Sequence, residues 1–335
     1  PLRSKTSVKD GILITAGVRP ADGGTEDPEY PCSRLIYNED DGENGIPFRG
    51  ALKTKTDGET VFGEDCIELK NASFAELYFN ISTGYIDFES APCGEYNNAS
   101  LSAVNGAEKK GFEKLCEAHV SDFRELYDRV HLELDSEESS LTTDERLKKF
   151  QKDKADLSLC VLLFNFGRYL AISASRPGST AMNLQGIWSD RYNAPWNANY
   201  TVNINTEMNY WPVLNSNLTE LDEPLIRTIK ELSVTGEVAA AKQYGAKGWV
   251  SHHNVDLWRL ATPVSGSASW AFWHGSSGWL CRHLYDRYEY TGDVEFLRKT
   301  AYPIMKGAAE FYLDIMTDYN GEKILCPGTS PENWF

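Results

Sequence analysis

The residues best suited to chemistry lie in residues 183–212, a segment rich in tryptophan and asparagine. Three tryptophans in it offer flat apolar faces on which a sugar ring can stack: Trp188, Trp196 and Trp211. Its asparagine amides both donate and accept hydrogen bonds without charge, so they suit sugar hydroxyls. Filling a large core is the competing explanation for the aromatic residues, and for most of them the better one.

Two asparagines in this segment, Asn203 and Asn205, are separated by one residue. In an extended backbone their side chains would point the same way, while Ile204 anchors the opposite side. Two converging amide oxygens could then hold a water molecule. A capped turn ahead of a helix beginning near Thr206 explains the same spacing equally well.

A second polar group, in residues 249–258, contains His252, His253 and Asp256. These residue types invite a metal hypothesis, but consecutive histidines point to different sides of a regular backbone, which is poor chelating geometry. We therefore predict no metal site and favour recognition of sugar hydroxyls. An ordinary structural loop is the remaining alternative.

A third candidate is Glu332, which lies in a Ser-Pro-Glu-Asn turn flanked by aromatic residues. If this turn holds the carboxyl rigid and partly desolvated, its pKa rises and it can stay protonated, as a general acid requires. A glutamate in a turn is more often simply solvated.

Before about residue 110 the sequence has the patterns of β-strands. Asp57-Gly58 lies between two strand-like runs, 48–54 and 60–69, which predicts a hairpin. Residues 75–82 alternate apolar and polar side chains, which predicts a strand with one buried face.

From Lys109 onward the apolar period becomes helical, beginning with residues 112–130. Thr142 and Glu145 have the spacing of a capping box. Further helices are predicted near 155–175, 221–244, 277–291 and 293–316, the last one kinked at Pro303. We interpret 155–175 as a core helix rather than a membrane span. Long helices joined by aromatic-rich loops indicate a toroid of helical hairpins with the site at one end.

Charge and cysteine content restrict the class of partner. The formal net charge of -16 argues against nucleic acid, which requires clustered Lys and Arg, and it suits a neutral substrate such as a sugar. The 7 cysteines include no C-x-x-C pair, which argues against a disulfide framework and a zinc site. Because no signal peptide is visible and the first residue is Pro1, the localisation is unassigned, cytoplasmic or secreted.

Eight motifs in order give the chain a specific resemblance to glycoside hydrolase family 95, the 1,2-α-L-fucosidase type of enzyme. They are GIPFRGALK, LTTDERL, FGRYLAISASRPGSTAMNLQGIW, NYTVNINTEMNYWP, GWVSHHNVDLW, GWLCRHLYDRYEYTGD, AYPIMKGAAEFYLD and TSPEN. The resemblance implies a multidomain α and β protein. Residues 1–108 would be the C-terminal part of a β-sandwich, 109–150 a helical linker, and 151–335 the first part of an (α/α)6 catalytic barrel.

The resemblance also implies inverting hydrolysis without a cofactor and assigns roles to three residues. Glu332 matches the general acid, and Asn203 and Asn205 match the pair that positions the attacking water. The family's general base is an Asp downstream of Ser-Pro-Glu-Asn, which we expect beyond residue 335. We therefore expect residues 1–335 alone to be inactive.

The substrate implied by the resemblance is a fucosylated oligosaccharide or glycan, cleaved at a terminal α-1,2-linked L-fucose. From the net charge and from the interpretation of 155–175 as a core helix, we expect neither nucleic acid nor membrane as a partner. His253, Trp258 and Trp273 are the candidate sugar contacts. The loop at Trp273–Ser276 and the pair Ala194-Pro195 depart from the family pattern, which affects the choice of sugar. Alternatives are an α-L-galactosidase of the same family, an inactive sugar-binding fragment, and another (α/α)6 enzyme with Glu207 as its acid.

Overall fold

The computed structural model describes residues 3–19, 45–93, 98–135, 139–190, 194–331 and 333. The chain forms two compact units, one of Pro1–Asp122 with Arg191–Asn193 and the other of Phe123–Asp190 with Ala194–Phe335. Helix α2 (Phe112–Tyr127) crosses the division between them. The domain boundaries proposed at 108 and 150 stay predictions.

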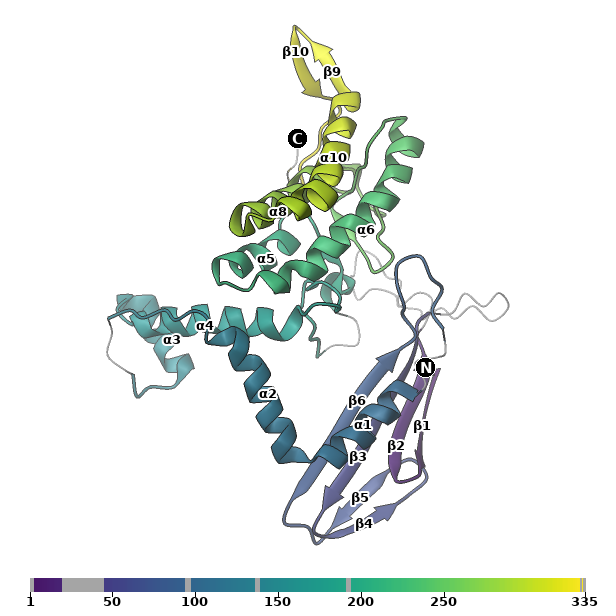
Figure 1. Ribbon diagram of the computed structural model, residues 1–335, viewed down its shortest axis with the longest axis vertical. Helices are drawn as coiled ribbons and strands as arrows, with labels where there is room; N and C mark the ends of the chain where they lie inside the picture. Colours follow the sequence, from purple (N-terminus) through teal and green to yellow (C-terminus); the bar gives the residue numbers. More distant parts are fainter. Residues whose placement is uncertain are drawn as a thin grey trace. The chain divides into compact units, whose positions relative to one another are not determined.

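The first unit contains a four-stranded antiparallel sheet in the order β1-β2-β3-β6 (Figure 1). Its strands are β1 (Arg3–Lys9), β2 (Ile12–Val18), β3 (Pro47–Thr56) and β6 (Ala75–Thr83). Asp10 and Gly11 connect β1 to β2, and both have positive φ, 51° and 73°. An Asp-Gly pair suits this turn because aspartate tolerates and glycine readily adopts left-handed backbone.

The hairpin predicted across Asp57-Gly58 is wrong in its pairing. β3 pairs along its length with β6, and the excursion between them forms its own hairpin of β4 (Glu59–Phe62) and β5 (Ile67–Lys70). Asp57 closes the base of this excursion, because its Oδ1 accepts a hydrogen bond from Ser73 N at 2.9 Å. The Asp-Gly pair therefore marks the start of an insertion rather than the turn between paired neighbours.

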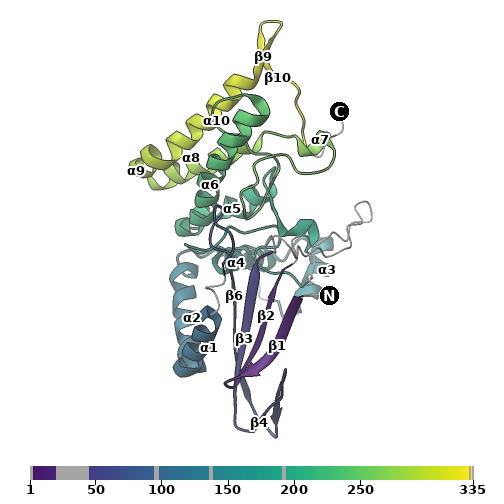
Figure 2. The ribbon, with the colours of Figure 1, turned by 90° about the vertical axis from the view of Figure 1, so that its right-hand side faces the viewer.

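Helix α1 (Ala99–Lys110) covers one face of the sheet (Figure 2). Its buried Val104 packs with Ile12, Ala51 and Tyr78 of the strands. This helix is not predicted from the sequence, in which the apolar period becomes helical only from Lys109. The apolar residues of α1 are few and small, so they give only a weak helical pattern in the sequence. Packing against the sheet is what buries Val104.

The alternation predicted for residues 75–82 is confirmed, but its apolar row is not the buried one. Tyr78, on the polar row, is buried against α1, whereas Phe79 is 66% exposed. Leu77 and Ile81 on the same side are also exposed, beside the half-buried Leu52 of β3. The sheet thus has a largely apolar second face among the residues that the structure describes.

The second unit is mainly helical, and the helices predicted from periodicity are confirmed. Its main helices are α3 (Thr143–Asp153), α4 (Leu157–Ala174), α5 (Asn205–Asn215), α6 (Glu223–Ala239), α8 (Ser276–Thr291) and α10 (Tyr302–Ile315). Short elements join them: η2 (Pro195–Ala198), β7 (Tyr200–Thr201), η3 (Thr219–Asp222), η4 (Ala240–Tyr244), β8 (Asn254–Val255), α7 (Ala268–Ala271), α9 (Val294–Phe296), η5 (Leu297–Ala301), β9 (Met316–Tyr319) and β10 (Glu322–Leu325). The capping box of Thr142 and Glu145 is present at α3. The sequence predicted a kink at Pro303. The structure has a π turn, η5, just before Pro303, and Pro303 itself lies in the first turn of α10.

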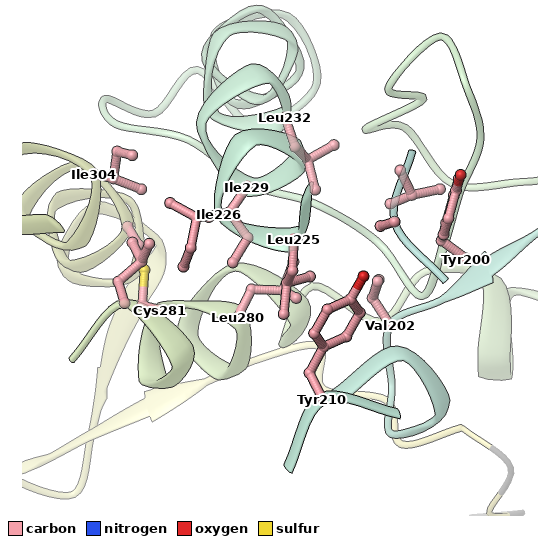
Figure 3. Packing of buried hydrophobic residues seen from close by; sticks show 14 of the residues in the cluster. Tyr200, Val202, Tyr210, Leu225, Ile226, Ile229, Leu232, Leu280, Cys281 and Ile304 are labelled. Carbon is pink, nitrogen blue, oxygen red and sulfur yellow. The ribbon is translucent and has the colours of Figure 1, made fainter. Parts of the chain in front are cut away.

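The core of this unit lies between α6, α8 and α10 (Figure 3). Leu225, Ile229 and Leu232 are three or four residues apart on α6, so they form one face of that helix. They pack with Leu280 and Cys281 of α8. This packing fixes α6 and α8, and the chain between these two helices contains residues 249–258 and Trp273.

Helix α4 is long and apolar enough to cross a membrane by length and composition alone. Its C-terminal half, including Ile172, lies in the helical core, while Leu163 and Phe166 are exposed. Arg168 is buried, and its guanidinium donates to the backbone oxygens of Tyr127 and Val130 at 2.6 and 2.9 Å. The interpretation as a core helix therefore fits the C-terminal half of α4.

Candidate active site

A short strand pair brings together two of the polar segments found in the sequence. β7 pairs antiparallel with β8, with Tyr200 opposite Val255, and Val202 N donates to His253 O at 2.7 Å. The segment 183–212 is thereby fixed beside the segment 249–258. Because these segments are about fifty residues apart in the chain, their proximity is a product of tertiary structure.

Asn203 and Asn205 lie where the chain leaves β7 and enters α5. Asn203 is half-buried in a turn, and Asn205 is exposed as the first residue of the helix. The prediction of an extended backbone anchored by Ile204 is wrong, because Ile204 is the N-cap residue (φ 173°, ψ -36°) and is 36% exposed. The alternative, a turn ahead of a helix, describes the backbone correctly, although the helix has no side-chain cap.

The amides of Asn203 and Asn205 form no hydrogen bond with any other residue that the structure describes. They flank a helix N-terminus, where backbone N–H groups lack intrahelical partners and carry partial positive charge. An amide at such a helix end can bind a water molecule or an electron-rich oxygen atom.

Helix α5 is held in place by a buried chain of hydrogen bonds through Tyr210. Met182 N donates to the Tyr210 hydroxyl at 2.9 Å, which is 2.8 Å from Ser175 Oγ, and Ser175 Oγ donates to Leu221 O at 2.8 Å. Since Ser175 uses its proton on Leu221, Tyr210 donates to Ser175. Burial raises the pKa of Tyr210 to about 12, so the hydroxyl keeps its proton at neutral pH.

His252 is a structural residue of the core rather than a ligand. Its Nδ1 is 2.6 Å from Ala261 O, which can only accept, so Nδ1 carries the proton and Nε2 accepts from the Tyr244 hydroxyl at 2.7 Å. Burial lowers its pKa to about 4. The role of Tyr244 could not be predicted, because a single tyrosine at the end of a helix forms no sequence pattern. Asp256 is used locally, since its Oδ1 accepts from Trp258 N at 2.9 Å.

The predicted sugar contacts lie in residues 249–258 and on the loop that precedes α8. His253 is buried with its ring edge-on to Trp270, 5.3 Å between centroids, and Trp258 is 38% exposed. Trp273 is half-buried on a loop tied to the His252 segment by Ser276 Oγ, which donates to Ser251 O at 3.0 Å. The structure therefore groups the segments that carry all three candidates.

Glu332 itself lies outside the described residues. The turn predicted around it is present, because Asn333 N donates to Ser330 O at 2.7 Å and Asn333 Nδ2 donates to Ser330 Oγ at 2.8 Å. The role assigned to Glu332 stays a prediction.

Glu207, the alternative acid, is completely buried in the first turn of α5. Neither of its carboxylate oxygens has a hydrogen-bond partner among the described residues. Burial raises its pKa to about 8, so the carboxyl is mainly neutral at pH 7. A carboxyl without exposed surface cannot reach a substrate, which disfavours Glu207 as the acid.

We expect Glu207→Gln to flatten the pH dependence of the free energy of unfolding. The folded-state pKa of Glu207 is about 8, above the ordinary 4.5. The contribution of the protonated carboxyl to the free energy of unfolding is therefore complete below about pH 4.5 and is lost as the pH rises from there through 8. The loss amounts to on the order of 5 kcal/mol. Urea unfolding at pH 5, 6.5 and 8 measures it. The exposed Glu237→Gln is the control, and an unchanged slope in Glu207→Gln would contradict the prediction.

Tyr244→Phe should destabilise the second unit by about 1–3 kcal/mol, because it leaves the buried Nε2 of His252 without a donor. Urea unfolding at neutral pH measures this change. Tyr302→Phe on α10 is the control, since Tyr302 is 61% exposed. Equal stability of both variants would show that the Tyr244–His252 hydrogen bond contributes nothing.

Comparisons with known proteins agree on one family. The model of the glycosyl hydrolase family 95 catalytic domain matches residues 111–335. Alpha-L-fucosidase 2 of Arabidopsis thaliana is 35% identical over 312 residues, which cover 88% of this chain and 36% of that protein. Probable alpha-fucosidase A of Aspergillus niger is 35% identical over 241 residues, 70% of this chain and 30% of that protein. The chain thus spans about a third of the length of these relatives.

A solved structure, a putative kojibiose phosphorylase from human microbiome, has a similar fold, with a TM-score of 0.56 at 12% identity. The likeness covers 95% of this chain and 37% of that one. At this identity it concerns the fold alone. The family match over residues 111–335 and the two relatives at 35% identity show that this chain belongs to glycosyl hydrolase family 95.

Proposed function

We propose that the protein to which this chain belongs is an inverting α-L-fucosidase that removes terminal, α-1,2-linked fucose from oligosaccharides or glycans. The family supports glycoside hydrolysis, and two relatives are named as α-fucosidases. The observation that carries the mechanism is the pair of amides at the N-terminus of α5, those of Asn203 and Asn205, which have no hydrogen-bond partner among the described residues.

In this proposal the two amide oxygens accept hydrogen bonds from the attacking water and orient it toward the anomeric carbon. A neutral amide is too weak a base to take the proton alone, so a carboxylate is also required. Inversion needs an acid on one side of the bond and the activated water on the other, with the carboxyls roughly 6.5–9.5 Å apart. The partial positive charge of the α5 N-terminus would stabilise the hydroxide character that develops on the water.

Glu332 is the proposed general acid, which protonates the oxygen of the leaving sugar. Support comes from the hydrogen-bonded turn between Ser330 and Asn333, which restricts the backbone on both sides of it. His253, Trp258 and Trp273 are proposed to contact the fucose, because their segments are tied to the turn that carries Asn203. Fucose has an apolar methyl side that suits aromatic contacts and hydroxyls that suit a histidine nitrogen.

The proposed layout is the C-terminal part of a β-sandwich in 1–108, a helical linker in 109–150, and the first part of an (α/α)6 barrel in 151–335. The apolar row of Leu77, Phe79 and Ile81 supports the first part, because such a face normally packs against a second layer. Helices packed around one core support the last part.

Hydrolysis of 2′-fucosyllactose by the full-length protein tests the proposal. Proton NMR of the first product should show β-L-fucose, the inverted anomer. The matching α-L-galactoside, which adds one hydroxyl, should be cleaved more slowly. Initial release of α-L-fucose would contradict inversion, and faster cleavage of the galactoside would favour the α-L-galactosidase alternative.

A further inference from the structure

The loop that leads into β7 contains three consecutive left-handed residues. Trp196, Asn197 and Ala198 have φ of 50°, 56° and 50°. None is glycine, and a side chain in this conformation crowds the following carbonyl oxygen. Strained backbone of this kind persists only where its surroundings hold it, and it is concentrated at functional sites.

Hydrogen bonds hold this turn from both sides. Within it, Asn197 N donates to Ala194 O at 2.9 Å and Asn199 N donates to Trp196 O at 3.2 Å. The neighbouring loop contributes Leu184 N, which donates to Asn199 O at 3.2 Å, and Gln185 Nε2, which donates to Pro195 O at 3.3 Å. These hydrogen bonds therefore hold the turn in its left-handed conformation.

What the turn presents is an exposed indole. Trp196 is 75% exposed, and its ring forms no hydrogen bond or aromatic contact with any other described residue. Burial of the ring therefore does not offset the strain. A flat, apolar and rigidly held surface suits a ligand with an apolar face, which the pyranose ring has.

The pairing of β7 with β8 shows that the turn of Trp196 and the amide pair lead to opposite ends of β7. Because the strands are antiparallel, the end of β7 that follows Trp196 lies next to the end of β8 that leads to Trp258. The opposite end of β7 leads to Asn203. The three residue-to-residue steps from Tyr200 to Asn203 span at most roughly 10 Å. The end of the β7–β8 pair from which the chain leads to Trp196 and Trp258 is thus separate from the amide pair. A short oligosaccharide is long enough to reach from one to the other.

We propose that the turn at Trp196–Ala198 is a preformed stacking platform for a pyranose ring of the leaving group, next to the fucose. This inference rests on the proposed function. The indole suits the leaving group rather than the fucose, because it is exposed and belongs to the end of β7 opposite the amide pair, where the bond would be cleaved. The platform would add affinity for natural oligosaccharides without taking part in bond cleavage.

Two substrates that share the fucose but differ in leaving group test the platform in the full-length enzyme. For Trp196→Ala we expect about a tenfold higher KM on 2′-fucosyllactose, and kcat/KM on α-L-fucosyl fluoride within twofold of wild type. Ala198→Pro keeps the indole but excludes positive φ, so it should have the same effect. Tyr302→Ala, an exposed aromatic residue of α10, is the control.

Melting temperatures confirm that each variant is folded. Equal losses of Trp196→Ala on both substrates, or no loss on either, would overturn the platform while leaving the proposed function intact. A wild-type enzyme that cleaves neither substrate would overturn the proposed function and the platform with it.

Discussion

Replacing Glu332 by Gln in the full-length enzyme should lower turnover of 2′-fucosyllactose by about 10²–10⁴-fold, the usual contribution of general acid catalysis. Glutamine keeps the shape of the side chain but cannot give a proton to the leaving oxygen. A sugar alkoxide is a poor leaving group, so the missing proton raises the barrier directly. Fluoride leaves with little protonation, and the loss on α-L-fucosyl fluoride should therefore be much smaller.

The control for this variant is Glu322→Gln, which changes an exposed glutamate in β10. It should retain wild-type rates on both substrates. Equal losses of the Glu332→Gln variant on both substrates would show that Glu332 does not protonate the leaving group.

Replacing Asn203 or Asn205 by Gly should lower turnover by about 10²-fold or more, comparable to removing one group that stabilises charge in a transition state. These variants disable the attacking water rather than the leaving group. The loss should therefore be similar for 2′-fucosyllactose and the fluoride, and it should affect kcat more than KM.

Asn217→Gly is the matched control for this pair, since Asn217 is exposed with a φ of 53° that glycine adopts freely. Recovery of the Asn203 or Asn205 variants on the fluoride substrate would assign these residues to leaving-group departure and contradict the proposal.

Helices with a wide apolar stripe could be predicted from the sequence, and those near 155–175, 221–244 and 277–291 are present. The features that were predicted wrongly depend on contacts with residues remote in the chain. The alternation in β6 reveals two faces, but only the packing of α1 decides that Tyr78 is covered and Phe79 is not. In the same way, Asp57-Gly58 predicts a turn, while the strands that pair around it are set by β6.

The candidate site was predictable in its residue types and less so in its geometry. The spacing of Asn203 and Asn205 identified the pair, but a helix start rather than an extended strand positions it. The pairing of β7 with β8 is two residues long, too short for a periodic signal. The left-handed turn at Trp196 has no sequence marker, since none of its residues is glycine.

The placement of Cys281 makes it a reporter of how often the helical core opens. Its thiol is packed among α6, α8 and α10, and burial raises its pKa to about 12. Alkylating reagents need an accessible thiolate, so they should modify the exposed Cys66, Cys116 and Cys326 first. The slow modification of Cys281 that follows would measure the kinetics of core opening in the native protein, without a probe having to be introduced.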